Sequence, residues 1–170
     1  MVSNLGVTIE YPYIRLQHQI QNFVRFCETV VRAGSVRRIT LITGYDERTP
    51  LAEMAEKLEE LKQSLIEVDV ELDVKLNSNI HDREIRIDNG WIVKIGRGLD
   101  FHQKPNGWFE IGANDMSLRK CLETKVDIYR SSGRLKRTRL SARSTQPNTQ
   151  TLRTYNVKHR YLLPARHSPQ

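Results

Sequence analysis

Residues 81–98 of this 170-residue chain read HDREIRIDNGWIVKIGRG, and this stretch determines which kind of sheet we expect. Asn89-Gly90 supplies the positive φ angles of a tight hairpin turn, and apolar residues alternate with polar ones on both sides of it. The pattern predicts two antiparallel strands over residues 82–87 and 91–95. Asp88 then opens the turn, an interpretation that we favour over a catalytic carboxylate.

Upstream of the hairpin, the apolar spacing switches repeatedly between the two-residue period of a strand and the 3.6-residue period of a helix. Thr49 is expected to cap the second helix, with Pro50 as its first residue. The expected elements in chain order are strand 7–11, helix 14–33, strand 36–43, helix 50–66, strand 68–76, strands 82–87 and 91–95, a loop over 96–117 and strand 123–130. This order predicts an α/β fold, a mixed sheet flanked by helices with an antiparallel addition.

Charge is distributed unevenly along the chain. There are 27 Lys and Arg residues against 20 Asp and Glu residues, a formal net charge of +7. Residues 131–170 hold nine of the basic residues and no acidic ones, so the first 130 residues are slightly acidic. Because residues 131–170 also lack an apolar period, we expect a folded domain over residues 1–130 and a basic, disordered tail over residues 131–170.

The composition excludes several classes of protein. With 38% hydrophobic residues and two cysteines, the chain is not collagen-like, a coiled coil or a disulfide scaffold. Two cysteines also favour a reducing compartment, and Cys121 has no Cys or His at metal-binding spacing, so we expect no metal site. Apolar runs are too short to span a membrane and no secretory signal is visible. We therefore expect a cytoplasmic protein without a cofactor.

The candidate chemistry lies at the start of the hairpin. Residues two apart on a strand point the same way, so we expect His81 and Arg83 to project together. A guanidinium group and an imidazole side by side form a site for phosphate. Arg97 lies between Gly96 and Gly98, which would let the backbone approach a ligand closely. The phosphate- or lipid-binding candidates are His81, Arg83, Lys94, Arg97 and Lys104. Lys104 shares its loop with Phe101 and Trp108, which suggests either a basic, aromatic-tipped membrane-contacting edge or an ordinary solvated loop.

The spacing His81-x-Arg83-x4-Asp88 resembles the His-x-Lys-x4-Asp motif of the phospholipase D superfamily. In that superfamily two such motifs meet: one histidine attacks phosphorus, the other protonates the leaving group, and each lysine holds phosphate. Here arginine replaces the lysine and a second motif is missing. We therefore expect no catalytic residues, with His81, Arg83 and Asp88 as vestigial candidates.

A wider resemblance covers residues 11–130 and rests on segments such as IHDREI (80–85) and KIGRGLD (94–100). These are similar to the phospholipase-D-like domain at the C-terminus of MIT-domain proteins. The resemblance implies a catalytically silent fold that binds phosphoinositide membranes and forms a homodimer. It also implies a peripheral membrane protein of the midbody and late endosome that acts with ESCRT-III in cytokinetic abscission. The MIT domain that binds ESCRT-III tails has no counterpart in this chain, so ESCRT-III contact is expected only through that missing domain.

Other interpretations of the same residues stay open. His81 and Arg83 would equally suit a structural pair bonded to Asp82, Glu84 or backbone. A phosphodiesterase or nuclease is the enzymatic alternative, with His81 as nucleophile and a second histidine supplied by a homodimer. The basic tail would suit anionic lipid or, as a weaker interpretation, nucleic acid, although a solvated extension without function is the interpretation we favour.

Overall fold

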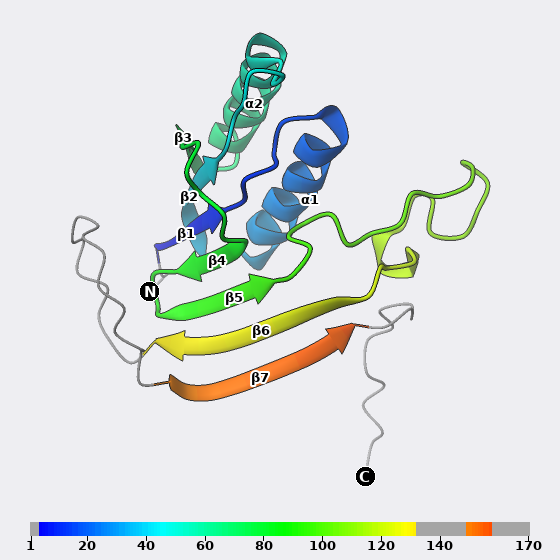
Figure 1. Cartoon of the computed structure of the whole chain (residues 1–170). Helices are drawn as coiled ribbons and strands as arrows, with labels where there is room; N and C mark the ends of the chain where they lie inside the picture. Colours follow the sequence, from blue (N-terminus) through cyan, green and yellow to red (C-terminus); the bar gives the residue numbers. More distant parts are fainter. Residues whose placement is uncertain (1–3, 132–148, 158–170) are drawn as a thin grey trace.

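A seven-stranded mixed sheet forms the centre of the computed structural model, which describes residues 4–131 and 149–157 (Figure 1). The strand order is β3-β2-β1-β4-β5-β6-β7. The strands are β1 (Leu5–Glu10), β2 (Val36–Thr43), β3 (Glu71–Leu76), β4 (Glu84–Ile87), β5 (Trp91–Ile95), β6 (Thr124–Ser131) and β7 (Thr149–Val157). The helices are α1 (Gln17–Ala33), α2 (Leu51–Ile66) and the short 3₁₀ helix η1 (Met116–Leu118). The predicted α/β class with an antiparallel addition is confirmed.

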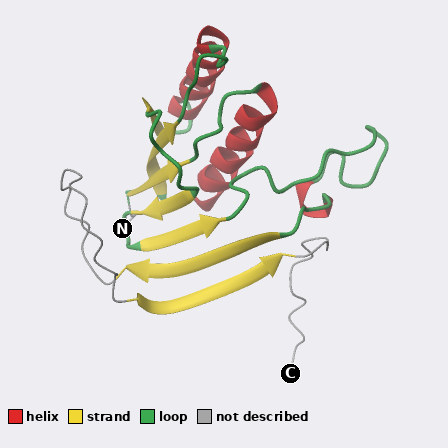
Figure 2. Cartoon of the chain, in the orientation of Figure 1, coloured by secondary structure: helices red, strands yellow, loops and turns green. Residues whose placement is uncertain are grey.

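The parallel half of the sheet consists of β1, β2 and β3, which α1 and α2 connect. Both helices lie on the same face of the sheet (Figure 2). The core forms where Ile39 and Leu41 of β2, which pair with Val7 and Ile9 of β1, meet the apolar stripes of the helices. Phe23 of α1 is fully buried there.

The first helix begins at Gln17 and not at residue 14. Two further local expectations for this half are also wrong. The second helix begins at Leu51 with Pro50 in the capping position, because the Thr49 hydroxyl bonds Asp46 and does not cap the helix. The third strand begins at Glu71 and not at residue 68. Asp69 lies in the left-handed region, with φ 58°, so the chain turns there before it extends.

The antiparallel half begins where β4 pairs with β1, and β5 and β6 follow. The predicted hairpin is confirmed, since Gly90 has φ 93° and its N–H donates to the Ile87 carbonyl oxygen at 2.8 Å. The first strand of the hairpin starts at Glu84, two residues later than predicted. His81 and Arg83 therefore lie in the segment that enters β4.

The expectation of a disordered tail over residues 131–170 is wrong for Thr149–Val157, which form β7 and pair antiparallel with β6. The segment holds three threonines, one tyrosine and one valine, and these residue types favour extended backbone. The pairing also gives backbone partners to β6, which would otherwise be an open sheet edge. The remainder of the expected tail, residues 132–148 and 158–170, lies outside the described residues.

The strand register brings several loops to one end of the sheet. Glu84, at the start of β4, pairs with Glu10 at the end of β1 and with Lys94 near the end of β5. The end of β1, the start of β4, the end of β5 and the start of β6 are therefore neighbours. We call this end the loop edge; its segments are residues 11–16, 44–50, 77–83 and 96–123. In Figure 1 it is the right-hand side of the sheet, where a long loop projects.

Candidate functional site

A pocket of about 280 Å³ opens at the loop edge. It is built by the segment before β4, the end of β5 and the start of β6. Its lining consists of His81, Asp82, Arg83, Lys94, Ile95, Gly96, Lys125 and Asp127. We call it the edge pocket. It brings together three of the predicted phosphate-binding residues, His81, Arg83 and Lys94.

Arg83 is held in the edge pocket by uncharged partners. Its Nη1 donates to the Gly96 carbonyl oxygen at 2.6 Å, and its guanidinium carbon lies 5.0 Å from the centroid of the Tyr13 ring. Within residues 4–131, none of the ion pairs involves Arg83. Its charge is therefore not neutralised by a carboxylate, and a planar guanidinium group in this state suits paired bonds to phosphate oxygens.

Lys94 is fixed from beneath by a buried carboxylate. Its Nζ lies 3.3 Å from Glu84, whose side chain is 1% exposed and also binds Arg86. Burial by itself would lower the pKa of Lys94, but the nearby Glu84 charge raises it above the usual value. Lys94 therefore stays a cation while it lines the pocket.

Lys125 is a member of the site that the sequence analysis missed. It precedes Asp127 by two residues on β6, and its Nζ lies 3.3 Å from that carboxylate. Asp127 pairs with Lys94 in the sheet register, so strand alternation places Lys125 on the same sheet face as Lys94. This alternation was a usable signal, but only once the pairing of β5 with β6 was known.

His81 and Asp88 do not form a pair. The exposed His81 borders the edge pocket, whereas Asp88 lies at the opposite end of β4. There the Asp88 carboxylate accepts a hydrogen bond from the Gly6 N–H at 3.0 Å. Because the intervening chain is extended, the x4 spacing carries Asp88 away from the pocket, and it acts as the turn residue that the hairpin predicted.

Arg97 lies at the loop edge outside the lining of the edge pocket, and its Nε donates to the Glu123 carbonyl oxygen at 2.9 Å. The following Gly98 has φ 59°, and a Cβ there would lie 2.1 Å from the ring of buried Tyr11. The close approach that we expected of a ligand at Gly98 is thus made by Tyr11. The Tyr11 hydroxyl donates in turn to the Asp100 carboxylate, which also accepts from Asn22 at 2.7 Å.

Lys104 does not line the edge pocket. It lines a cavity of about 50 Å³ in the projecting loop, together with Glu110, Arg119 and Lys120. The sequence predicted that Lys104 would act with His81 and Arg83, but the structure places Lys104 in a different cavity.

Cys121 has a histidine neighbour that its sequence spacing did not reveal. Its Sγ lies 3.5 Å from Nδ1 of His102. Burial raises the pKa of Cys121, and burial with the charges of Arg119 and Arg25 lowers the pKa of His102 to about 4. The two groups are therefore a neutral thiol and a neutral imidazole at pH 7. No group of three or more potential metal ligands occurs in the part of the chain that the structure describes.

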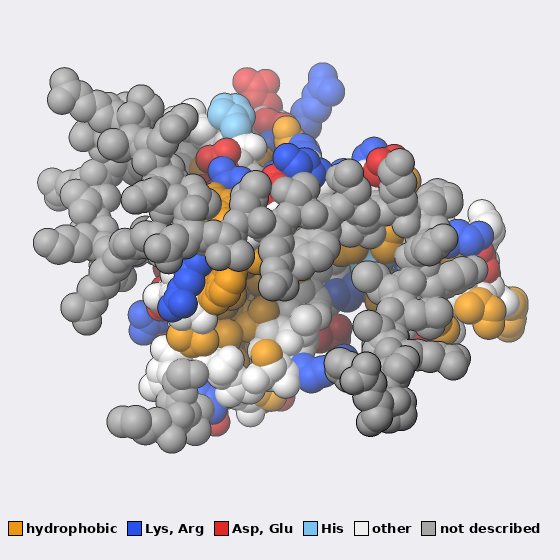
Figure 3. Space-filling view, turned by 90° about the horizontal axis from the view of Figure 1, so that it is seen from below, with side chains coloured by type: hydrophobic (Ala, Val, Ile, Leu, Met, Phe, Trp, Pro, Cys, Tyr) orange, Lys and Arg blue, Asp and Glu red, His pale blue; other side chains and the backbone are white. Residues whose placement is uncertain are grey.

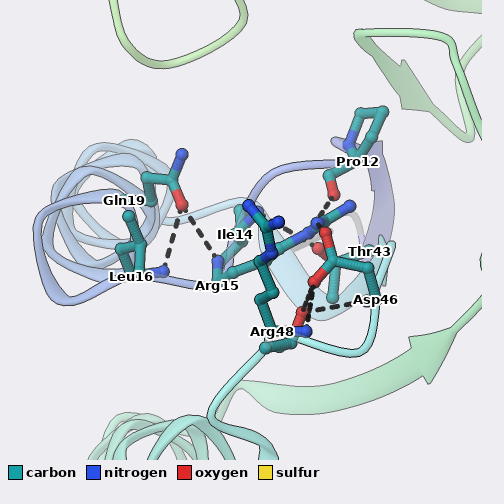
Figure 4. Close-up of polar contacts among 9 residues, drawn as sticks. Pro12, Ile14, Arg15, Leu16, Gln19, Thr43, Asp46 and Arg48 are labelled. Carbon is teal, nitrogen blue, oxygen red and sulfur yellow. Dashed lines mark hydrogen bonds and ion pairs between the residues drawn. The ribbon is translucent and has the colours of Figure 1, made fainter.

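A second pocket, of about 250 Å³, lies beside the first at the loop edge. Figure 4 shows its polar framework, in which Arg15 binds Asp46 and donates from Nε to the Pro12 carbonyl oxygen at 3.3 Å. The Arg15 guanidinium also lies 5.6 Å from the Tyr13 ring centroid. Hydrogen bonds from Thr49 and Arg48 and the charge of Arg15 lower the pKa of Asp46. Arg15 is paired with Asp46, whereas none of the ion pairs in the described residues involves Arg83, so we regard the edge pocket as the stronger anion site.

Comparison with known proteins agrees with this architecture. The family model described as the phospholipase D-like domain at the C-terminus of MIT matches residues 3–130, and the chain belongs to this family. A mouse relative, MIT domain-containing protein 1, is 50% identical over 124 residues, which cover 72% of this chain and 50% of the relative. The chain thus spans about half the length of that relative. The resemblance predicted from the sequence is confirmed, and strand β7 lies beyond the matched residues.

None of the helices in the described ranges has the length and apolar character needed to cross a bilayer.

Proposed function

We propose that this chain is a non-catalytic membrane-binding module whose edge pocket binds the phosphate groups of phosphoinositides. The observation that carries the proposal is the convergence of Arg83, Lys94 and Lys125, from three neighbouring segments, on one open pocket. Its volume, about 280 Å³, is near the lower end of ligand pockets and suits a small polar headgroup.

The balance of charge in the pocket favours phosphate monoesters over diesters. Asp82 and Asp127 also line the pocket, and Lys94 and Lys125 already pair with carboxylates, so an anion must compete with carboxylates for these two lysines. A monoester carries about −1.5 to −2 charges at pH 7 and three acceptor oxygens. The phosphodiester that links every phospholipid headgroup carries one negative charge and competes less well. Phosphoinositides present monoesters, whereas phosphatidylcholine and phosphatidylserine do not.

We propose that binding occurs without turnover. In the superfamily mechanism two histidines act on one phosphate, and within the described residues His81 is the one histidine that lines the edge pocket. Asp88, which the motif would place in support of a histidine, lies at the other end of β4. By family resemblance we further propose a homodimer that acts in ESCRT-III-dependent abscission, at the midbody and late endosome.

Co-sedimentation with vesicles tests the proposal. Phosphatidylcholine vesicles with and without a phosphatidylinositol bisphosphate are compared for the protein and for Arg83→Ala/Lys125→Ala. At about 1 kcal/mol for each cation, the double variant should lose roughly 30-fold in phosphoinositide-dependent affinity. Arg32→Ala/Lys62→Ala, on α1 and α2, removes equal charge away from the pocket and should bind normally. Equal binding to both vesicles, or an equal loss in both variants, would contradict the proposal.

The enzymatic alternative makes a different prediction. If two chains bring their His81 side chains together, a chromogenic phosphodiester should be hydrolysed and His81→Ala should abolish the turnover. We expect no turnover above the buffer rate. Turnover that depends on His81 would replace the binding module with a dimeric phosphodiesterase.

A further inference from the structure

The loop over residues 103–120, which we call the tip loop, projects from the loop edge beyond the sheet (Figure 1). Its base is closed by backbone pairing. Gln103 donates to the Lys120 carbonyl oxygen at 2.8 Å, and Leu122 donates to that of Phe101 at 2.6 Å. An isolated β-bridge between His102 and Cys121 joins the same two segments. The two ends of the tip loop are therefore held together by backbone pairing.

A polar frame inside the tip loop orders it further. Arg119, which is 8% exposed, donates from Nη2 to the Ala113 carbonyl oxygen at 2.5 Å, and its Nε donates to that of Gly112. Nearer the tip, the Asn106 N–H donates to the Glu110 carboxylate at 2.8 Å. These polar bonds hold the backbone at Asn106, Gly112 and Ala113.

Three large apolar side chains at the tip face solvent. Trp108 is 78% exposed, Phe109 105% and Ile111 73%. Hydrophobic side chains are visible at the far right of Figure 3, where the tip loop of Figure 1 projects. An ordered loop that leaves two aromatic residues and an isoleucine unpacked within four positions marks an interaction site.

Charge and shape favour a lipid surface as the occupant. Lys104 and Lys120 lie behind the tip, and Lys120 pairs with Glu110 at 3.4 Å. Residues 103–120 hold three basic and two acidic residues, so the apolar group stands on a loop with a small positive charge, which suits an anionic bilayer. A protein partner would need about 800 Å² of each surface, and the two aromatic residues supply roughly 150–250 Å² each. The edge pocket lies at the same end of the sheet as the tip loop.

We propose that the tip loop inserts Trp108, Phe109 and Ile111 into the interfacial region of an anionic bilayer. The insertion rests on the proposed membrane-binding function, but it uses a surface separate from the edge pocket. The loop anchors the domain through apolar contact, while the pocket selects the headgroup. Tryptophan suits this role because its amphipathic ring partitions to the level of the headgroups, and phenylalanine because its apolar ring is buried at the boundary with the acyl chains.

Fluorescence of Trp108 reports insertion directly. The chain has two tryptophans, so Trp91→Phe leaves Trp108 as the reporter. On phosphatidylcholine–phosphatidylserine vesicles its emission should shift to the blue, and lipids brominated near the headgroup should quench it. Phe109→Ser/Ile111→Ser should weaken vesicle binding about tenfold or more. Ile66→Ser/Val68→Ser removes two exposed apolar side chains at the opposite end of the sheet and should bind normally.

The pocket variant separates this inference from the proposed function. Arg83→Ala/Lys125→Ala should lose the preference for phosphoinositide and keep the blue shift of Trp108 on phosphatidylserine vesicles. If this variant loses only its preference for phosphoinositide, both proposals are supported. If the unaltered protein shows no such preference, the proposed function of the pocket is contradicted and insertion of the tip loop is not. No vesicle binding, unchanged Trp108 emission in bound protein, or full binding by Phe109→Ser/Ile111→Ser would overturn insertion. Reduced self-association of that variant in sedimentation, with unchanged vesicle binding, would also overturn it and assign the tip to a second copy of the chain.

Discussion

At the scale of single residues, several side chains have roles that differ from those their sequence positions suggested. Gly98 was expected to admit a ligand, and it instead makes room for the ring of Tyr11. Cys121 has no Cys or His at metal-binding spacing in the sequence, and in the structure it contacts His102. Both differences have the same physical origin. A local sequence shows which conformations a residue tolerates, but the neighbour that requires the conformation comes from tertiary packing.

Replacement of Gly98 tests that assignment. Gly98→Ala places a Cβ in the left-handed backbone region and against a buried aromatic ring, so it should lower the free energy of unfolding by about 3 kcal/mol. Gly96→Ala is the matched control, since its Cβ would meet nothing closer than 3.6 Å. Urea unfolding of both variants measures the difference. Equal stabilities would show that Tyr11 does not require glycine at position 98.

His102 predicts how stability depends on pH. Its pKa is about 4 in the folded state against 6.5 for the unperturbed group. Between these values the unfolded chain binds a proton that the folded protein excludes, so stability should fall as pH falls from 6.5 towards 4.

Comparison with His102→Asn isolates this effect from other titrating groups. Allowing for solvent at the half-buried ring, the protein should lose on the order of 1 kcal/mol more than the variant over this range. Urea unfolding at several pH values measures it. Parallel pH curves for the two proteins would contradict the account.

At the scale of elements, the hairpin of β4 and β5 was predictable because Asn89-Gly90 and the alternation around it act locally. Lys125 was not predictable as a site residue, because its place depends on which strand β6 pairs with. Strand β7 was missed for a related reason. Its period is weak, and the open edge of β6 that it pairs with is a property of the sheet.

The ion pair between buried Glu84 of β4 and Lys94 of β5 supports the site, because it holds Lys94 in place across the two strands. Glu84→Ala leaves Lys94 and Arg86 without their shared carboxylate and should cost about 3 kcal/mol of stability. Glu71→Ala, which removes an exposed pair with Arg38, should cost less than about 1 kcal/mol. Thermal or urea unfolding compares the two. Similar small losses would mean that Glu84 does not organise the pocket.

At the scale of the whole molecule, the net charge of +7 does not locate the anion site. Residues 1–130 carry slightly more acidic than basic residues, so binding there depends on a local cluster. The fold creates that cluster by bringing the end of β5 and the starts of β4 and β6 to one edge. The tip loop leaves and returns at the same edge. The same end of the sheet thus carries a basic pocket and an apolar tip, the two features on which the proposed membrane binding depends.

The most direct test of the central claim is an amide chemical-shift titration of the protein with a soluble inositol phosphate. We expect saturable shifts concentrated at the edge pocket, at Arg83, Lys94, Gly96 and Lys125, and we expect their loss in Arg83→Ala/Lys125→Ala. Shifts centred on the second pocket around Arg15 and Arg48, or on residues 131–170, with the edge pocket unchanged, would contradict it.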